Sequence, residues 1–127
     1  EERENSFNYN FAKLLHARGR HDRALQILNQ VKFRDLLPNL TARLLEHKIY
    51  YEQGDFDVLE SSLHTVERML RRKRQLSYHK KVYLNWIRLM RQLVNLNRYS
   101  REEKEHLRQR IQQTSPLPER GWLLEQL

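Results

Sequence analysis

The stretch Tyr50-Tyr51-Glu52-Gln53-Gly54-Asp55-Phe56-Asp57 contains the signals that decide the fold of this chain. Apolar residues recur at helical spacing before and after it, and glycine is common directly after the last residue of a helix. Asp55 is a suitable N-cap for a following helix. A similar turn, Gly19-Arg20-His21, lies 35 residues upstream. The sequence therefore predicts two consecutive helix–turn–helix pairs.

Helical hydrophobic spacing continues along the chain and predicts about six helices followed by a short C-terminal capping helix. Short links between them favour antiparallel packing of neighbouring helices. Ser77 is expected to cap the fifth helix, and Ser100 with Glu103 to form a capping box at the sixth. The closing helix is expected to bury Trp122. The expected breaks are Gly19, Asp35–Pro38, Gly54, Arg71–Arg74, Asn97 and Pro116–Pro118.

The composition favours an all-α domain and excludes several classes of protein. Leucine occurs 22 times, against 12 valine, isoleucine and threonine residues together, and only three glycines and three prolines are present. No run of about 18 apolar residues exists, which excludes a membrane span. The absence of cysteine excludes a disulfide scaffold and fits a cytoplasmic location. We expect one helical domain over residues 1–127, compatible with the C-terminal part of a longer protein.

The helix pairs resemble tetratricopeptide repeats, whose helix–turn–helix unit spans about 34 residues. Phe11-Ala12-x-x-Leu15 and Ala24-x-x-x-Leu28 match the family's spacing in the first unit, and Trp86-x-x-Leu89-Met90-x-x-Leu93 matches it in the third. The chain departs from the family at Glu46-His47, which replace a leucine and a small residue. Asn97 replaces the turn glycine, and asparagine tolerates the positive φ expected there. The resemblance implies a right-handed superhelical array of antiparallel helix pairs, with units of roughly residues 5–38, 39–75 and 76–114 and a cap over 115–127.

Nothing in the sequence indicates catalysis. No glycine-rich phosphate loop, H-E-x-x-H or G-x-S-x-G motif is present. The six histidines include no pair at i, i+4 spacing, so we interpret them as surface or half-buried helix residues. We therefore expect no catalytic site, no metal site and no cofactor.

The net charge of +8 is concentrated in one part of the chain. Residues 1–63 are nearly neutral, whereas residues 64–127 hold 15 basic and 6 acidic residues. The stretch Arg68–Arg101 contains 11 lysines and arginines and no acidic residue. A helix face of like charges repels itself unless an anion binds to it. The candidate basic patch consists of Arg71, Arg72, Lys73, Arg74, Lys80, Lys81 and Arg88.

Besides a merely solvated face, three interpretations of this stretch are open: an acidic protein partner, an acidic surface of a longer parent chain, and RNA or single-stranded DNA. Tyr78, Tyr83, Trp86 and Tyr99 interleave with the cations, as in proteins that stack nucleic-acid bases. Trp86 and Tyr99, however, fall in positions where the repeat family packs its core. The nucleic-acid interpretation is therefore the weaker one.

Corresponding helix positions in the three units predict a peptide-binding groove. In tetratricopeptide arrays the first helix of each pair lines the concave face, and Lys13, Lys48 and Arg91 occupy the same position in successive units. Such cations, flanked by apolar and aromatic residues, suit an acidic or C-terminal peptide. We therefore expect a non-catalytic protein–protein interaction module or scaffold. The candidate groove residues are Tyr9, Lys13, His16, Lys48, Tyr51 and Arg91.

Overall fold

The computed structural model describes residues 1–75 and 77–127, with Ser77 described by its backbone alone. In these residues the chain forms seven α-helices and no strand, which confirms the predicted all-α class. Two compact units are present, residues 1–62 and residues 63–127, and the boundary falls within α4. The helices are α1 (Glu2–Ala17), α2 (His21–Leu28), α3 (Leu36–Gln53), α4 (Phe56–Arg71), α5 (Ser77–Val94), α6 (Arg101–Gln113) and α7 (Arg120–Glu125).

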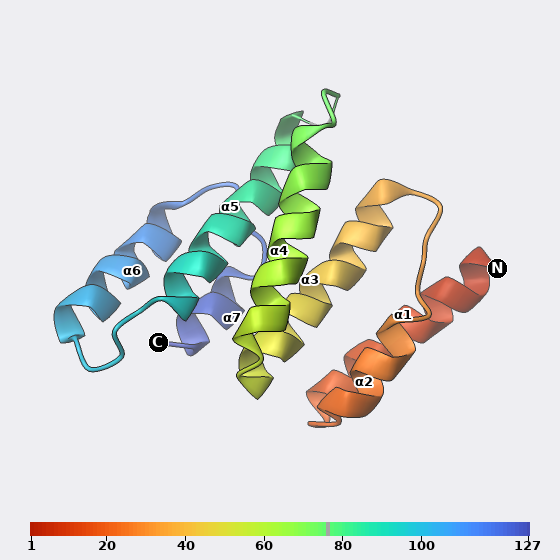
Figure 1. Ribbon diagram of the computed structural model, residues 1–127, viewed down its shortest axis with the longest axis horizontal. Coiled ribbons are helices and arrows are strands. Elements are labelled where there is room, and N and C mark those ends of the chain that lie inside the picture. The colour runs from red at the N-terminus through yellow and green to blue at the C-terminus, as the bar shows by residue number, and fades with distance from the viewer. Residues whose placement is uncertain (76) are drawn as a thin grey trace. The chain divides into compact units, whose positions relative to one another are not determined.

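In the first unit α1 and α2 form a hairpin that packs on α3 (Figure 1). The two predicted turns have the same local structure. Gly19 and Gly54 both take left-handed backbone angles, with φ of 75° and 74°. In each turn the next amide reaches back to a carbonyl five residues earlier, from Arg20 to Leu15 at 2.8 Å and from Asp55 to Tyr50 at 2.9 Å. This is the Schellman arrangement that ends helices at glycine. The core of the unit consists of Ala12, Leu15, Ala24, Ile27, Leu28, Val31, Ala42, Leu45 and Ile49.

Helix α3 begins earlier than the sequence suggests. The expected break extends to Pro38, but the helix begins at Leu36 with Asp35 as its N-cap. Proline is compatible with this position because the first-turn amides of a helix have no partner within the helix. The preceding helix α2 ends at Leu28, and Val31 is fully buried in the connection that follows it.

Two asparagine side chains hold the connection between α2 and α3. Asn5 on α1 pairs with the backbone of Lys32: its Nδ2 donates to the carbonyl at 2.9 Å, and its Oδ1 accepts from the amide at 3.2 Å. Asn39 on α3 pairs with Phe33 in the same way, accepting from the amide at 2.6 Å and donating to the carbonyl. The connection thus has backbone partners although it has no regular secondary structure.

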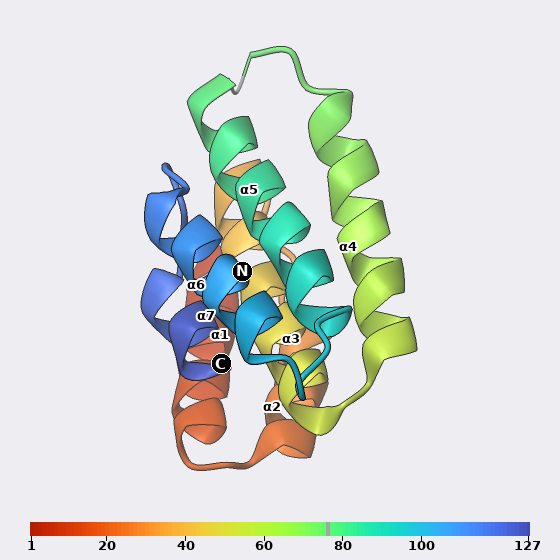
Figure 2. The ribbon, with the colours of Figure 1, turned by 90° about the vertical axis from the view of Figure 1, so that its left-hand side faces the viewer.

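In the second unit the C-terminal part of α4 and α5 run antiparallel on either side of their connection, and α6 and α7 follow (Figure 2). Trp86 on α5 is fully buried, and its ring centroid lies 5.9 Å from that of Trp122 on α7. The predicted burial of Trp122 by the closing helix is therefore confirmed. Leu107 and Ile111 are the buried residues of α6, as its otherwise polar sequence indicates.

The predicted caps of the second unit have different outcomes. The Ser100 hydroxyl accepts from the Glu103 amide at 3.1 Å, as expected. The Glu103 carboxylate, however, accepts from the Asn97 amide rather than from that of Ser100. The predicted cap at Ser77 depends on a side chain that lies outside the described part of the chain.

The expectation for Asn97 is wrong. Its φ is not positive; its side-chain oxygen instead accepts from the Tyr99 amide at 3.0 Å, which makes a local turn without the left-handed conformation. The expected core position of Tyr99 is also wrong, because this side chain is 98% exposed.

Candidate functional site

The predicted groove residues of the first unit are largely engaged within that unit. Tyr9 packs against the core, and the Lys13 ammonium lies 5.6 Å from the centre of the Tyr9 ring. Tyr51 is buried, with its ring 5.6 Å from that of Phe56. Lys13 is exposed and Lys48 is half-buried. The remaining first-unit residue of the predicted groove, His16, is hydrogen-bonded to Glu52.

The sixth residue of the predicted groove, Arg91, belongs to the second unit and forms an ion pair there. Its guanidinium donates to Glu67 on α4 at 2.9 Å, and Arg71 donates to the other carboxylate oxygen at 3.2 Å. The hydrogen bond from Arg91, with that from Arg71, holds the pKa of the Glu67 carboxyl below its ordinary value. Arg91 therefore links α4 to α5. The groove across the three predicted repeat units stays a prediction.

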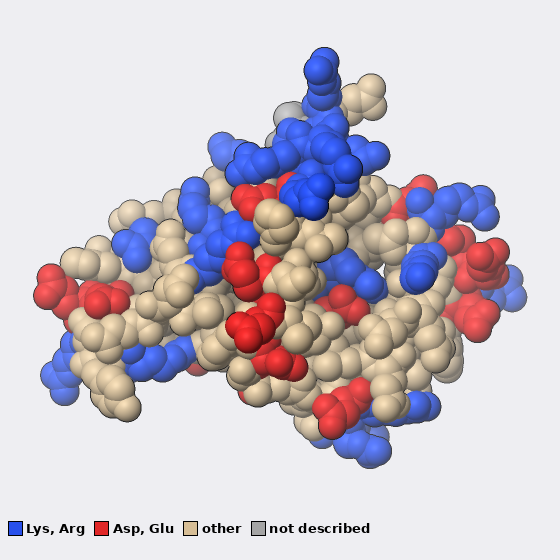
Figure 3. Space-filling model, in the orientation of Figure 1, with Lys and Arg blue, Asp and Glu red and all other residues tan. Residues whose placement is uncertain are grey.

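The basic patch lies around the connection between α4 and α5. Figure 3 shows blue side chains crowded at the end of this hairpin. All its residues are exposed except Lys80, which is half-buried and donates to the Lys73 carbonyl at 3.0 Å. Lys81 and Arg88 extend the patch along α5, because residues seven apart lie on one helix face.

Most cations of the basic patch have no counter-charge. Among the described residues, Arg71 has Glu67 as a partner, but none of the others forms an ion pair with an acidic side chain. The second unit therefore presents a concentrated positive surface that is not neutralised by its own residues. The side chains of the patch without an acidic partner are Arg72, Lys73, Arg74, Lys80, Lys81 and Arg88.

A shallow pocket of about 360 Å³ adjoins this patch in the second unit. Arg71, Arg88 and Arg91 contribute its positive wall, and Leu84 contributes an apolar one. Asn85 at the pocket is itself fixed, since its amide donates to the Pro116 carbonyl at 2.8 Å. The other lining residues are Glu67 and Gln92.

The aromatic residues of the basic stretch are split between core and surface. Trp86 is buried, as expected from the repeat pattern, and Tyr83 is half-buried. Tyr78 is 64% exposed beside the patch, and its ring packs edge-on against that of His79, with the two ring centroids 5.4 Å apart. Tyr99 is exposed but lies away from the patch, because it follows the C-terminal end of α5 whereas the patch lies around the N-terminal end of α5.

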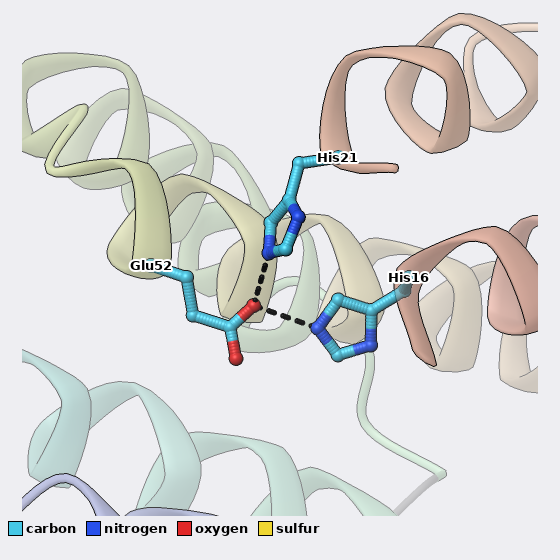
Figure 4. A group of neighbouring side chains, drawn as sticks. All are labelled: His16, His21 and Glu52. Carbon is cyan, nitrogen blue, oxygen red and sulfur yellow. Dashed lines mark hydrogen bonds and ion pairs between the residues drawn. The ribbon is translucent and has the colours of Figure 1, made fainter. Parts of the chain in front are cut away.

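A second cluster, in the first unit, consists of His16, His21 and Glu52 (Figure 4). The two imidazole Nε2 atoms lie 2.7 Å and 2.8 Å from the same carboxylate oxygen, Oε1 of Glu52. The i, i+4 spacing of histidines on one helix does not reveal this cluster, because its three residues come from three different helices. The signal that was available is the pair of histidines on either side of the Gly19 turn, where a Schellman turn brings both side chains to one end of the hairpin.

A third group, also in the first unit, is a buried polar cluster on α3. Glu46 and His47 are 5% and 1% exposed where the repeat family has apolar and small residues. His47 lies 2.9 Å from the Ser62 hydroxyl, and Arg43 lies 3.4 Å from Glu46 while donating to the carbonyls of Leu28 and Val31. These residues therefore connect α3 to the end of α2 and to α4.

Burial sets the protonation of this cluster. Desolvation, with a smaller contribution from Arg43, lowers the pKa of His47 to about 3. Desolvation also raises the pKa of the Glu46 carboxyl, although the Arg43 charge acts against that shift. At neutral pH His47 is thus a neutral hydrogen-bonding residue of the core.

No protein-family model, no curated protein and no solved structure matches this chain. The resemblance to tetratricopeptide repeats therefore stays a prediction from the sequence. Among the described residues, no helix combines the length and the apolar character needed to cross a membrane.

Proposed function

We propose that this chain is a non-catalytic binding module that takes an acidic segment of a partner protein on the basic patch of its second unit. The observation that supports this proposal is the set of cations without an acidic partner around the α4–α5 connection, all of them exposed except Lys80. Like charges held this close repel each other, and a bound anionic segment relieves that repulsion. The same patch would speed the association of an acidic partner by long-range attraction.

The features beside the patch favour a peptide over a nucleic acid. The adjoining pocket combines arginines with the apolar Leu84, which suits a segment that alternates acidic and apolar side chains. Single-stranded nucleic acids are held by stacking successive bases on several aromatic side chains. Beside the patch, Tyr78 is the one strongly exposed aromatic among the described residues. We therefore favour the acidic protein segment and treat nucleic acid as an outcome of the test.

The test is fluorescence anisotropy with a short labelled peptide rich in glutamate and leucine. We expect the triple variant Arg72→Glu, Arg74→Glu, Lys81→Glu to bind at least about tenfold more weakly than the wild type, since each exposed ion pair contributes about 0.2–1 kcal/mol and reversal adds repulsion. The matched control makes the same charge change at Arg3, Arg18 and Arg34, which are exposed in the first unit. Equal weakening by the control would show that only net charge matters and would refute the proposal.

The two alternatives are separated by further arms of the same experiment. A Lys13→Glu, Lys48→Glu variant tests the predicted groove, and we expect it to bind the peptide like the wild type. A single-stranded oligonucleotide is titrated over a salt series, because phosphate neutralisation gives a steep salt dependence. Tight oligonucleotide binding by the wild type without peptide binding would overturn the proposal in favour of nucleic acid.

A further inference from the structure

The cluster of His16, His21 and Glu52 brings three possible metal ligands together from three helices. His16 lies in the last turn of α1, His21 is the first residue of α2, and Glu52 lies in the last turn of α3. Their ligand atoms all lie within 4.8 Å of one another. The Gly19 turn sets the two imidazoles side by side, with ring centroids 5.3 Å apart and planes at 70°.

The side chains point inward at a common centre, as Figure 4 shows. An ionised carboxylate only accepts hydrogen bonds, so each imidazole donates from Nε2 to the shared Glu52 oxygen. Both donor hydrogens therefore occupy the space between the three ligand atoms. A metal ion would take the place of these two hydrogens, and each neutral imidazole would then carry its hydrogen on Nδ1.

We propose that His16, His21 and Glu52 form a binding site for a zinc ion. Zinc binds imidazole nitrogen and carboxylate oxygen at about 2.0–2.2 Å, which sets tetrahedral ligands about 3.3 Å apart. The two nitrogen–oxygen distances of 2.7 Å and 2.8 Å need to widen by about half an ångström to reach this spacing. Small side-chain rotations achieve that, because all three residues are partly exposed and can move without disturbing the core.

The donor set selects the class of ion. Calcium and magnesium take oxygen ligands, whereas two imidazoles and one carboxylate suit zinc and its neighbours in the first transition row. The three side chains are 17–25% exposed, so a water molecule can complete the coordination sphere. The bound ion would join the α1–α2 turn to the end of α3, next to the hydrogen bond from Gln53 to Asp22 at 2.8 Å. Its role there is to hold the three helix ends together.

The experiment measures zinc binding to the untagged chain by isothermal titration calorimetry. We expect one zinc ion per chain, and a loss of affinity of at least tenfold in His21→Ala and in Glu52→Gln. Glu52→Gln keeps the size of the side chain and an oxygen that accepts hydrogen bonds, so it tests the ligand without removing packing. The matched control is His64→Ala, since His64 is an exposed histidine on α4 outside the cluster. We expect it to bind zinc like the wild type.

A second measurement distinguishes a built site from weak surface binding. Cobalt(II) bound to the wild type should give the intense visible absorption of four-coordinate cobalt, and Glu52→Gln should lose it. Magnesium should not compete with zinc. Absence of stoichiometric zinc binding, or an equal loss of affinity in His64→Ala, would refute the site.

Discussion

Neutral His47 in the core makes the stability of this protein sensitive to acid in a way that one substitution should remove. In the unfolded chain the imidazole takes up a proton at its ordinary pKa of 6.5, whereas burial lowers the pKa in the folded protein to about 3. Between these pH values the unfolded state binds one proton more than the folded state. The free energy of unfolding therefore falls as the pH falls below 6.5 and is fully retained above it.

The size of this effect follows from the pH interval. Each pH unit below 6.5 lowers the free energy of unfolding by about 1.4 kcal/mol until the folded pKa is reached. From pH 6.5 to pH 4.5 the loss attributable to His47 is roughly 2 kcal/mol, because the imidazole of the unfolded chain is only half protonated at pH 6.5. That is a large part of the 5–15 kcal/mol that typical domains have. The raised pKa of Glu46 acts in the opposite direction, because a carboxyl that binds its proton more tightly when folded favours the folded state as the pH falls.

The variant His47→Gln isolates the contribution of His47. Glutamine does not titrate, and its amide can keep a hydrogen bond to the Ser62 hydroxyl. Glu46 is present in both proteins, so its effect largely cancels in the comparison. Urea unfolding followed by far-UV circular dichroism at pH 6.5, 5.5 and 4.5 gives the free energies. We expect the wild type to lose roughly 2 kcal/mol more than His47→Gln over this range. The same pH dependence in both proteins would show that His47 is protonated in the fold and would refute the reasoning.

Three further predictions concern the packing and the turns. Gly54→Ala should lower the free energy of unfolding by about 1 kcal/mol, because alanine is strained at the φ of 74°. Gly121→Ala in α7 should raise the free energy of unfolding by about 0.5 kcal/mol, because a Cβ added at this position meets open space. Urea unfolding midpoints measure both changes. Trp122→Ala should cost about 3 kcal/mol and shift the fluorescence of Trp86, its ring neighbour, to longer wavelength. Asn5→Ala should cost about 1–2 kcal/mol and accelerate hydrogen exchange at the amide it holds in the α2–α3 connection; unchanged exchange there would contradict the assigned pairing.

Local signals in the sequence predicted most of the helix boundaries. Gly19 and Gly54 end helices because glycine takes the left-handed conformation without strain, and Ser100 caps α6 because its hydroxyl reaches the Glu103 amide. Such signals act over a few residues, so they are readable without knowing the tertiary structure. Asn97 shows their limit, since its side chain made a turn that needs no positive φ.

The candidate sites were less predictable because they depend on contacts between distant residues. The basic patch could be recognised from the run of cations, but the ion pair between Glu67 and Arg91 joins residues 24 apart in sequence. In the second cluster, His16 and His21 flank the turn between α1 and α2, whereas Glu52 lies at the end of α3. The repeat spacing predicted Tyr99 in the core, but Tyr99 lies in the turn that the Asn97 side chain makes after α5, and it is 98% exposed there.

The pairing of Asn5 with Lys32 and of Asn39 with Phe33 has a consequence for how this sequence can change over evolutionary time. Each asparagine amide binds only backbone atoms of the α2–α3 connection, so the side chains at these two connection positions are not specified by that contact. Diverging copies of the gene are free to vary the exposed connection positions Lys32 and Arg34 while both asparagines and the buried Val31 persist. We expect two widely spaced, invariant asparagines, flanking a segment that varies at its exposed positions, to be the mark by which distant relatives of this chain can be recognised.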